Sequence, residues 1–163
     1  RLGCFYDDAM RVPFWLRLPR TLDTTETPLF AKDIIQSQNR NIQNIDILPT
    51  ILQAWNKKPL AYKGTSLLSP TSPSRIISGQ NTSEIRAWSP EGMFVLKDSI
   101  KLILSNHEDP QLFNIQNDPS EKNNLWNKPT YQAKHKPWLK EYIHSNPGRK
   151  ALCSRLGPKC PLN

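Results

Sequence analysis

The sequence predicts an irregular α+β fold, in which a small antiparallel sheet of about four strands packs against helices. The chain has 163 residues, which is enough for one domain with a hydrophobic core. Only 37% of it is hydrophobic, and its 15 prolines outnumber its 6 glycines, a composition typical of interrupted elements joined by long connections. Its second half contains several short apolar runs separated by turn residues, which is the pattern of an antiparallel sheet.

The first apolar segment lies in "FYDDAMRVPFWLRLP". Asp7 and Asp8 are expected to begin a short helical turn, and no acid–base role is assigned to them. The apolar residues that follow predict a buried strand, whose pairing Pro13 limits at one edge. These residues are Val12, Phe14, Trp15, Leu16 and Leu18.

A helix from about Ile47 to Trp55 is predicted by "NIQNIDILPTILQAW", in which apolar residues recur at roughly helical spacing. Asp46 can cap this helix, and Pro49 falls in its first turn, where proline is tolerated. We expect the apolar stripe of the helix to be buried on a sheet. Residues 56–74 then form a loop with a turn at Gly64.

Residues 75–105 have the composition of strands, in the runs "RIISGQ", "EIRAWSPEG", "MFVLKDS" and "IKLILS". The last two runs flank residues 97–99, which predicts a hairpin. The segment "NHEDPQLFNIQ" supplies a further strand. The sheet of this half is therefore expected to be built from strands that follow one another along the chain.

The stretch "PQLFNIQNDPSEKNNLWN" predicts a strand, a tight turn and the start of a capped helix. Asp118 would be the N-cap, Pro119 the first helical residue and Glu121 the acid of a capping box. A last helix is predicted from about Lys134 to Ser145, ended by "NPG". Its apolar face would consist of Trp138, Leu139, Tyr142 and Ile143.

The formal net charge is +8 and the pI is about 9.6, which favours polyanionic partners. The sequence has no RNA-binding aromatic signature, no zinc-finger spacing and no phosphate-cradling glycine loop, so nucleic acid is not expected as a partner. No apolar run is long enough to span a bilayer. The chain opens on "RLGCFYDDAM", without an initiator methionine, and we expect it to be a piece of a longer polypeptide.

The three cysteines leave two interpretations open. Cys153 and Cys160 have the spacing of a small disulfide loop, which would fit an oxidising compartment and leave Cys4 over. The alternative is three unrelated thiols. A metal site is not expected, since the chain has no C-x-x-C pair and its three histidines are not at ligand spacing.

Four motifs together resemble the sulfatase family, in the order in which the family has them. They are "YDDAMRVPFWLRLP", "NIDILPTIL", "KGTSLL" and "IKLILSNHEDPQLFNIQNDPSEKNNL", and they cover residues 6 to about 125. The resemblance implies the C-terminal part of an alkaline-phosphatase-like α/β fold. Residues 1–60 would be the last strand and helix of the large domain, 61–75 a linker loop, and 76–150 the C-terminal antiparallel-sheet subdomain with its terminal helix. Residues 151–163 would be a tail with the candidate disulfide loop.

The resemblance also implies what the parent enzyme does. Sulfatases are metal-dependent hydrolases, whose large N-terminal part carries a formylglycine nucleophile and most metal ligands. This chain has no C-x-[PS]-x-R nucleophile motif, so no catalytic residue and no metal ligand is assigned in it, and we expect it to be inactive alone. A divalent metal, calcium by resemblance, would be bound by the parent. The upstream catalytic part would be its partner, and the location would be extracytoplasmic: periplasmic, secreted or a lysosomal-type lumen.

Three basic residues are candidates for contact with an anionic sulfated or phosphorylated substrate: Arg86, Lys97 and Lys101. Arg and Lys stabilise developing oxyanion charge. The alternative is that they are ordinary surface residues of strands. Many members of the family have a sulfate-contacting lysine at the position of Leu2, and this chain has Arg1 beside it, so the basic role is either shifted or lost.

Two other functions stay open at this point. The same superfamily includes phosphoethanolamine and phosphoglycerol transferases and phosphodiesterases, some of them membrane-tethered, so membrane anchoring of the parent is compatible with the motifs. A non-catalytic basic module that binds polyanions would fit the charge alone.

Overall fold

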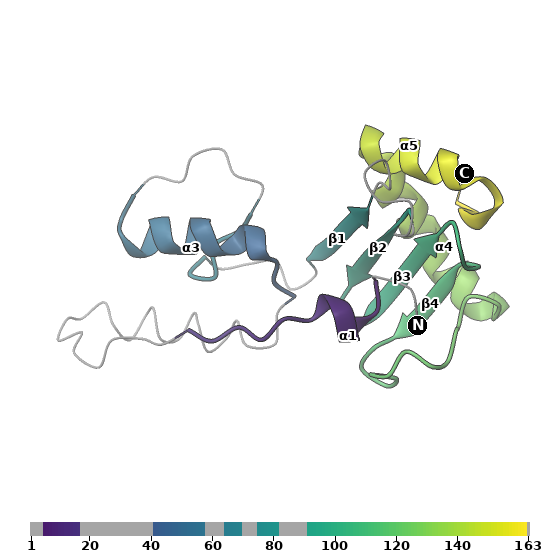
Figure 1. Ribbon diagram of the computed structural model, residues 1–163, viewed down its shortest axis with the longest axis horizontal. Coiled ribbons are helices and arrows are strands. Elements are labelled where there is room, and N and C mark those ends of the chain that lie inside the picture. Colours follow the sequence, from purple (N-terminus) through teal and green to yellow (C-terminus); the bar gives the residue numbers. More distant parts are fainter. Residues whose placement is uncertain (1–4, 17–40, 58–63, 70–74, 82–90, 163) are drawn as a thin grey trace. The chain divides into compact units, whose positions relative to one another are not determined.

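A computed structural model describes residues 5–16, 41–57, 64–69, 75–81 and 91–162 (Figure 1). The chain forms two compact units. One contains residues 1–12 with 78–163, and the other contains residues 13–77. The predicted segment 1–60 is therefore divided between the two units. Its first twelve residues group with the C-terminal sheet, and residues 13–60 belong to the other unit.

The larger unit is built on a four-stranded sheet in the order β1-β2-β3-β4 (Figure 1). Its strands are β1 (Ile76–Asn81), β2 (Gly92–Lys97), β3 (Ile100–Ser105) and β4 (Gln111–Asn114). The predicted antiparallel sheet is confirmed for these four strands, whereas most of the run "EIRAWSPEG" lies outside the described residues. Strands β2 and β3 form the predicted hairpin, in which Lys97 pairs with Ile100. Asp98 in the turn has a φ of 53°, a conformation that Asp tolerates better than most residues.

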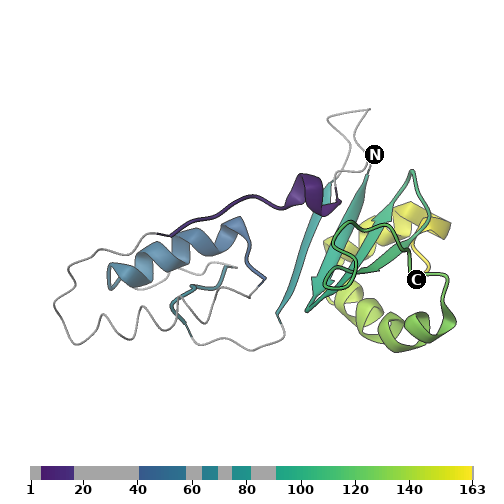
Figure 2. The same ribbon diagram turned by 90° about the horizontal axis from the view of Figure 1, so that it is seen from below.

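Each face of the sheet is covered by a different part of the chain (Figures 1 and 2). The helices α4 (Pro129–His144) and α5 (Pro147–Leu156) lie on one face, over fully buried side chains such as Val95, Leu102 and Leu104. The N-terminal segment with its short helix α1 (Asp7–Met10) lies on the other face. Side chains alternate along a strand, so both faces contribute to one core.

Helix α4 begins five residues before the predicted start and ends one residue before the predicted end. Leu139 and Ile143 are fully buried, as its predicted apolar face requires, while Trp138 and Tyr142 are half-buried. The "NPG" sequence ends α4, but it also begins α5, which was not predicted. The side chain of Asn146 accepts a hydrogen bond from the amide of Arg149, and Pro147 takes the first helical position. The predicted tail thus begins with the second half of α5.

The prediction of a helix starting at Asp118 is wrong. Residues 115–128 run as turns and irregular chain to the start of α4. Glu121 has a φ of 50°, which is incompatible with a right-handed helix, and its side chain is buried. Asp118 instead accepts a hydrogen bond from the amide of Asn123, five residues on.

The smaller unit contains the 3-10 turn η1 (Asn44–Asp46) and the helix α3 (Ile47–Ala54), close to the predicted helix. The predicted burial of its apolar stripe is wrong. The exposed large apolar side chains of this region are Ile45, Ile47, Leu48, Ile51 and Trp55. Among the described residues of the unit, no strand covers them.

The predicted buried strand near the N-terminus is also wrong where it can be checked. Residues 11–16 form no strand, and Trp15 is 85% exposed. Val12, Phe14 and Leu16 are exposed as well, and Leu18 lies outside the described residues. An apolar strand needs neighbours on its faces, and the described part of the chain supplies none.

Candidate functional site

The three predicted substrate-contacting residues have different environments. Arg86 lies outside the described residues. Lys97 is half-buried, with its Nζ 5.2 Å from the centre of the Trp138 ring. Lys101 is only 1% exposed, so it is not the surface strand residue of the alternative reading. The structure does not bring Lys97 and Lys101 together on one face, because they lie on opposite faces of the sheet.

Lys101 is the centre of a buried ion cluster that joins three distant segments. Its Nζ lies 2.6 Å from Oδ1 of Asp7 and 2.8 Å from Oε1 of Glu121. The other carboxylate oxygen of Glu121 accepts a hydrogen bond of 2.7 Å from the amide of Asp7. A buried ammonium is stable only when it is paired, and here two carboxylates supply the charge. In this arrangement the ammonium group is satisfied within the chain and is not presented to a ligand.

Tyr6 fixes the same N-terminal segment through a second polar group. Its hydroxyl lies 2.6 Å from Oε1 of Gln111 and 2.9 Å from Oε2 of Glu108. The Gln111 amide also donates to Glu108, at 2.8 Å. The Tyr6 ring packs against Phe113, with ring centres 6.2 Å apart. The "YDD" motif is therefore held on the sheet by both residues Tyr6 and Asp7.

Asn124 of the "NNL" sequence covers the free edge of β4. Its side-chain oxygen accepts from the amide of Leu112, and its side-chain nitrogen donates to the carbonyl of Pro110, each at 3.0 Å. The amide of Leu125 adds a backbone hydrogen bond of 2.7 Å to the carbonyl of Leu112. An uncovered edge strand invites unwanted pairing, so this loop completes the sheet.

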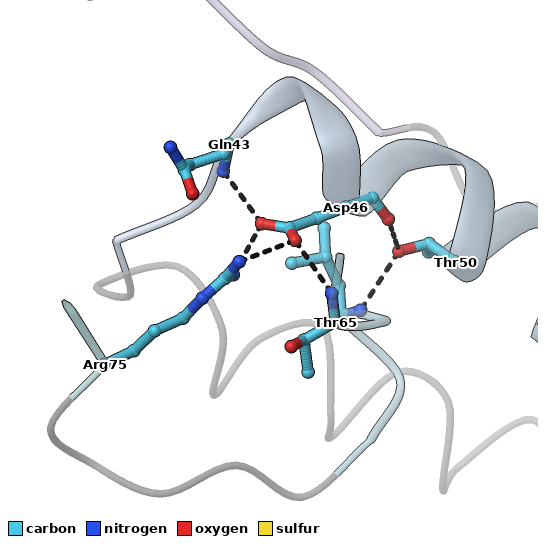
Figure 3. Close-up of polar contacts among 6 residues, drawn as sticks. Gln43, Asp46, Thr50, Thr65 and Arg75 are labelled. Carbon is cyan, nitrogen blue, oxygen red and sulfur yellow. Dashed lines mark hydrogen bonds and ion pairs between the residues drawn. The ribbon is translucent and has the colours of Figure 1, made fainter. Parts of the chain in front are cut away.

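A second buried charge, Asp46, organises the smaller unit (Figure 3). Its carboxylate receives two hydrogen bonds from the guanidinium of Arg75, at 2.5 and 2.8 Å. It also accepts from the amides of Gln43 and Thr65, both at 2.8 Å. The predicted role as cap of α3 is replaced by these contacts, since the side chain makes no capping bond to that helix.

The pKa of Asp46 reflects opposing effects. Burial of the carboxyl raises its pKa, but the hydrogen bonds from Arg75, Thr65 and Gln43 and the positive charge of Arg75 lower it. The lowering effects are stronger together, so the pKa lies below its ordinary value of 3.8. Asp46 is therefore ionised at neutral pH and acts as a fixed anchor.

Thr50 and Gly64 complete the junction between the "NIDILPTIL" and "KGTSLL" motifs. The Thr50 hydroxyl donates to the carbonyl of Asp46 at 2.6 Å and accepts from the amide of Leu67 at 3.0 Å (Figure 3). A Cβ at Gly64 would lie 2.0 Å from the carbonyl oxygen of Ile45, so only glycine fits this close approach. The two motifs thus meet as one buried unit.

The helical layer contains an aromatic group and a disulfide. The indole N–H of Trp138 donates to Nδ1 of His135 at 3.2 Å, and the Tyr131 ring stacks on the imidazole with ring centres 6.1 Å apart. Burial lowers the pKa of His135, and the charge of Lys134 adds to this effect, so the imidazole is neutral at pH 7. Cys153 and Cys160 form a disulfide with a Cα–Cα distance of 5.3 Å.

The motifs are visible in the sequence, but the way they pair in space is not. The local pattern predicts substrate contact for Lys101 and helix capping for Glu121. Neither prediction takes account of residues that are distant in the sequence. The strand pattern did carry a signal. Lys101 stands within the apolar run "IKLIL", where both faces of a covered sheet are buried.

The described residues contain no group of three or more His, Cys, Asp or Glu side chains that could hold a metal ion. Within that same part of the chain, no helix has the length and apolar character needed to cross a membrane.

No protein-family model matches the chain, and no curated protein matches it. Several solved structures do match. A candidate sulfatase from Bacteroides thetaiotaomicron VPI-5482 is 23% identical with a TM-score of 0.48, and a 2-O GAG sulfatase is 23% identical with a TM-score of 0.47. Each match covers 61% of this chain and 24% of the other.

A third structure, of a protein in complex with its substrate D-glucosamine-2-N,6-O-disulfate, is 19% identical with a TM-score of 0.53. That match covers 65% of this chain and 24% of the other. The chain therefore spans about a quarter of the length of each of these structures. The match with a TM-score of 0.53 shows that this chain shares its fold with part of that third structure.

Proposed function

We propose that this chain is the C-terminal segment of a sulfatase-like hydrolase that acts on sulfate esters. The nucleophile and most metal ligands of that enzyme would lie upstream of this chain. The residues of this chain would complete the fold. They would also hold the N-terminal segment, which would join this chain to the upstream part of the enzyme. By resemblance, hydrolysis would proceed through a covalent intermediate formed on the upstream nucleophile.

The observation that carries this proposal is the pairing of the four sulfatase-like motifs in space. The "YDD" motif meets the "IKLIL" and "DPSEKNNL" sequences at Lys101 and Glu121. The "NIDILPT" motif meets "KGTS" at Asp46 and Thr65. Residues that match a family pattern and also form buried contacts with one another are better support than any motif alone.

A divalent metal, calcium by resemblance, belongs to this proposal only through the upstream part. The described residues do not fit such a site, since they offer no cluster of three ligands. No step is derived through a metal for this chain. The oxidising, extracytoplasmic location stays a proposal, supported by the disulfide between Cys153 and Cys160.

The test uses the complete protein, with the residues that precede Arg1. Free sulfate would be measured by ion chromatography after incubation with sulfated amino sugars, and free phosphate after incubation with phosphate mono- and diesters. We expect sulfate release that is lost when the upstream nucleophile is replaced by alanine. Transfer or release of phosphate groups alone would assign the chain to the phosphotransferase branch of the superfamily.

A further inference from the structure

The sequence contains one motif that the proposed function does not use. Residues 81–83 read Asn-Thr-Ser, which is the acceptor pattern N-x-[ST] of N-linked glycosylation. In the 163-residue sequence, Asn81 is the only asparagine that has a serine or threonine two residues later with no proline between. Thr82 and Ser83 lie outside the described residues and enter here by sequence alone. Because a three-residue pattern is short, the position of Asn81 in the fold and its compartment have to support it.

Asn81 lies where β1 leaves the packed part of the sheet. Two residues earlier, a Cβ at Gly79 would lie 2.5 Å from the Phe94 ring, so one face of the strand is closely packed there. On the other face, the hydroxyl of Ser78 lies 3.0 Å from a tyrosine hydroxyl of α4. The last two residues of β1 differ, since Gln80 is exposed and Asn81 is half-buried. The end of β1 therefore reaches solvent on both faces, as a bulky surface glycan requires.

The strand that carries Asn81 is also an edge strand (Figure 1). In the order β1-β2-β3-β4 it has β2 on one side, and the described residues place no strand on its other side. The side chains of the central strands β2 and β3 are mostly buried, so a bulky polar group fits at the end of the edge strand and not on them. A glycan at this position would also shield the free edge, which otherwise invites pairing with another chain.

The disulfide supplies a second, independent observation. Cys153 and Cys160 are bonded to each other, and both are buried. Disulfides form and persist in oxidising compartments. The secretory lumen of a eukaryotic cell is a compartment in which disulfides form and in which N-linked glycans are attached. Such a lumen accounts for both the motif and the disulfide, whereas a bacterial periplasm accounts for the disulfide alone.

We propose that Asn81 carries an N-linked glycan that is attached in a secretory lumen. The donor would be an oligosaccharide joined to a membrane polyprenol through a diphosphate, and a membrane-bound transferase of the host cell would catalyse the transfer. The side-chain nitrogen Nδ2 of Asn81 forms a bond to the anomeric carbon of the first sugar and loses a proton. The bond between that carbon and the diphosphate oxygen breaks, and the polyprenyl diphosphate leaves. The inference rests on the extracytoplasmic location within the proposed function, and not on its catalytic activity.

The first measurement is mass spectrometry of the protein isolated from the cells that produce it. Trypsin cleaves after Arg75 and Arg86 and releases residues 76–86, in which Asn81 is the only asparagine. We expect this peptide to carry hexose and N-acetylhexosamine units on Asn81. An unmodified peptide in a protein whose Cys153 and Cys160 are bonded would overturn the inference.

The second measurement uses the complete protein, translated in the presence of microsomal membranes that supply the donor and the transferase. Transfer to the entering chain does not depend on the stability of the folded variants. N81Q and S83A should each migrate faster than the wild type by one glycan in gel electrophoresis, because each removes an essential residue of the motif. The matched control T82A should migrate with the wild type, since the middle position excludes only proline. An N81Q protein with the mobility of the wild type would overturn the inference.

These measurements are independent of turnover. A glycan on Asn81 of a protein that releases no sulfate would reject the proposed enzyme and keep the modification site. Sulfate release by a complete protein whose Asn81 is unmodified would reject the modification site alone.

Discussion

Lys101 is a lysine at a position that the sheet would otherwise fill with an apolar side chain. It is tolerated because Asp7 and Glu121 reach it from two other segments of the chain. Neighbouring β2 contains Lys97, which makes a cation–π contact with Trp138. The two lysines therefore provide a matched comparison of a buried and a half-buried cation.

Lys101→Met should destabilise the protein by about 3–5 kcal/mol, because it leaves two carboxylates close together without their cation. Lys97→Met should cost no more than about 1 kcal/mol, the usual size of an accessible cation–π contact. Urea denaturation followed by circular dichroism measures both. Equal losses would show that the cluster around Lys101 does not hold the N-terminal segment.

Asp46 predicts a pH dependence of stability. Its pKa in the folded chain is below the ordinary value of 3.8, so the stability it contributes is fully present above that value. That contribution is lost as the pH falls below 3.8 and then passes the lowered pKa of Asp46 in the folded chain. Asp46→Asn should therefore be less stable than the wild type at pH 6, by about 3–5 kcal/mol as for a broken buried pair.

The difference between Asp46→Asn and the wild type should shrink between about pH 4 and about pH 2, because only the wild type loses the ionised carboxylate. Thermal melting over this range measures it. A difference that stays constant as the pH falls would contradict the pairing with Arg75.

At the scale of elements, helix α5 and the disulfide act together. The bond joins Cys153 in α5 to Cys160, just beyond the short 3-10 turn η3 (Gly157–Lys159). Leu156 and Leu162 are buried on either side of this turn. A closed loop restricts the unfolded chain, and the restriction is greater for longer loops.

The variant C153S/C160S should lose about 2–3 kcal/mol, the value expected for a loop of this length. Thermal melting with and without dithiothreitol checks the prediction. The reductant should lower the Tm of the wild type toward that of the variant and leave the variant unchanged. A wild-type Tm that does not respond to the reductant would show that the disulfide contributes no stability.

The exposed apolar side chains of α3 and of residues 12–16 should make the isolated chain associate with itself. Trp15 is 85% exposed and Trp55 is 71% exposed, and contiguous exposed apolar surface is typical of interaction sites. The variant W15S/W55S should shift the chain toward monomer in analytical ultracentrifugation, whereas K57S/K122S should not. A wild-type chain that is monomeric at all concentrations would contradict this prediction.

Sequence patterns predicted the strands and most helices because their periodicity is local. The runs around Val95 and Leu102 alternate with turn residues, and the structure places strands there. Sequence patterns gave wrong predictions where long-range contacts decide the local backbone conformation. Glu121 has the spacing of a helix-capping acid, but its ion pair with Lys101 holds it in another conformation. Helix α5 was missed because it carries few apolar residues and its burial depends on α4.

At the scale of the whole molecule, the sheet has a different partner on each face. The N-terminal segment covers the face of Lys101, and α4 and α5 cover the other (Figure 2). The proposed enzyme would use the first layer to join its upstream part. The catalytic residues of the proposed enzyme could not be predicted from this sequence, since it contains no C-x-[PS]-x-R motif.

The most direct test of the proposed function is the coding sequence that precedes Arg1. We predict a cysteine or serine in a C/S-x-P/S-x-R context, and an Asp-His-Gly sequence shortly before this chain. A threonine nucleophile behind several membrane-spanning helices would contradict sulfate ester hydrolysis and favour phosphate transfer. A start codon directly before Arg1 would contradict the account as a whole.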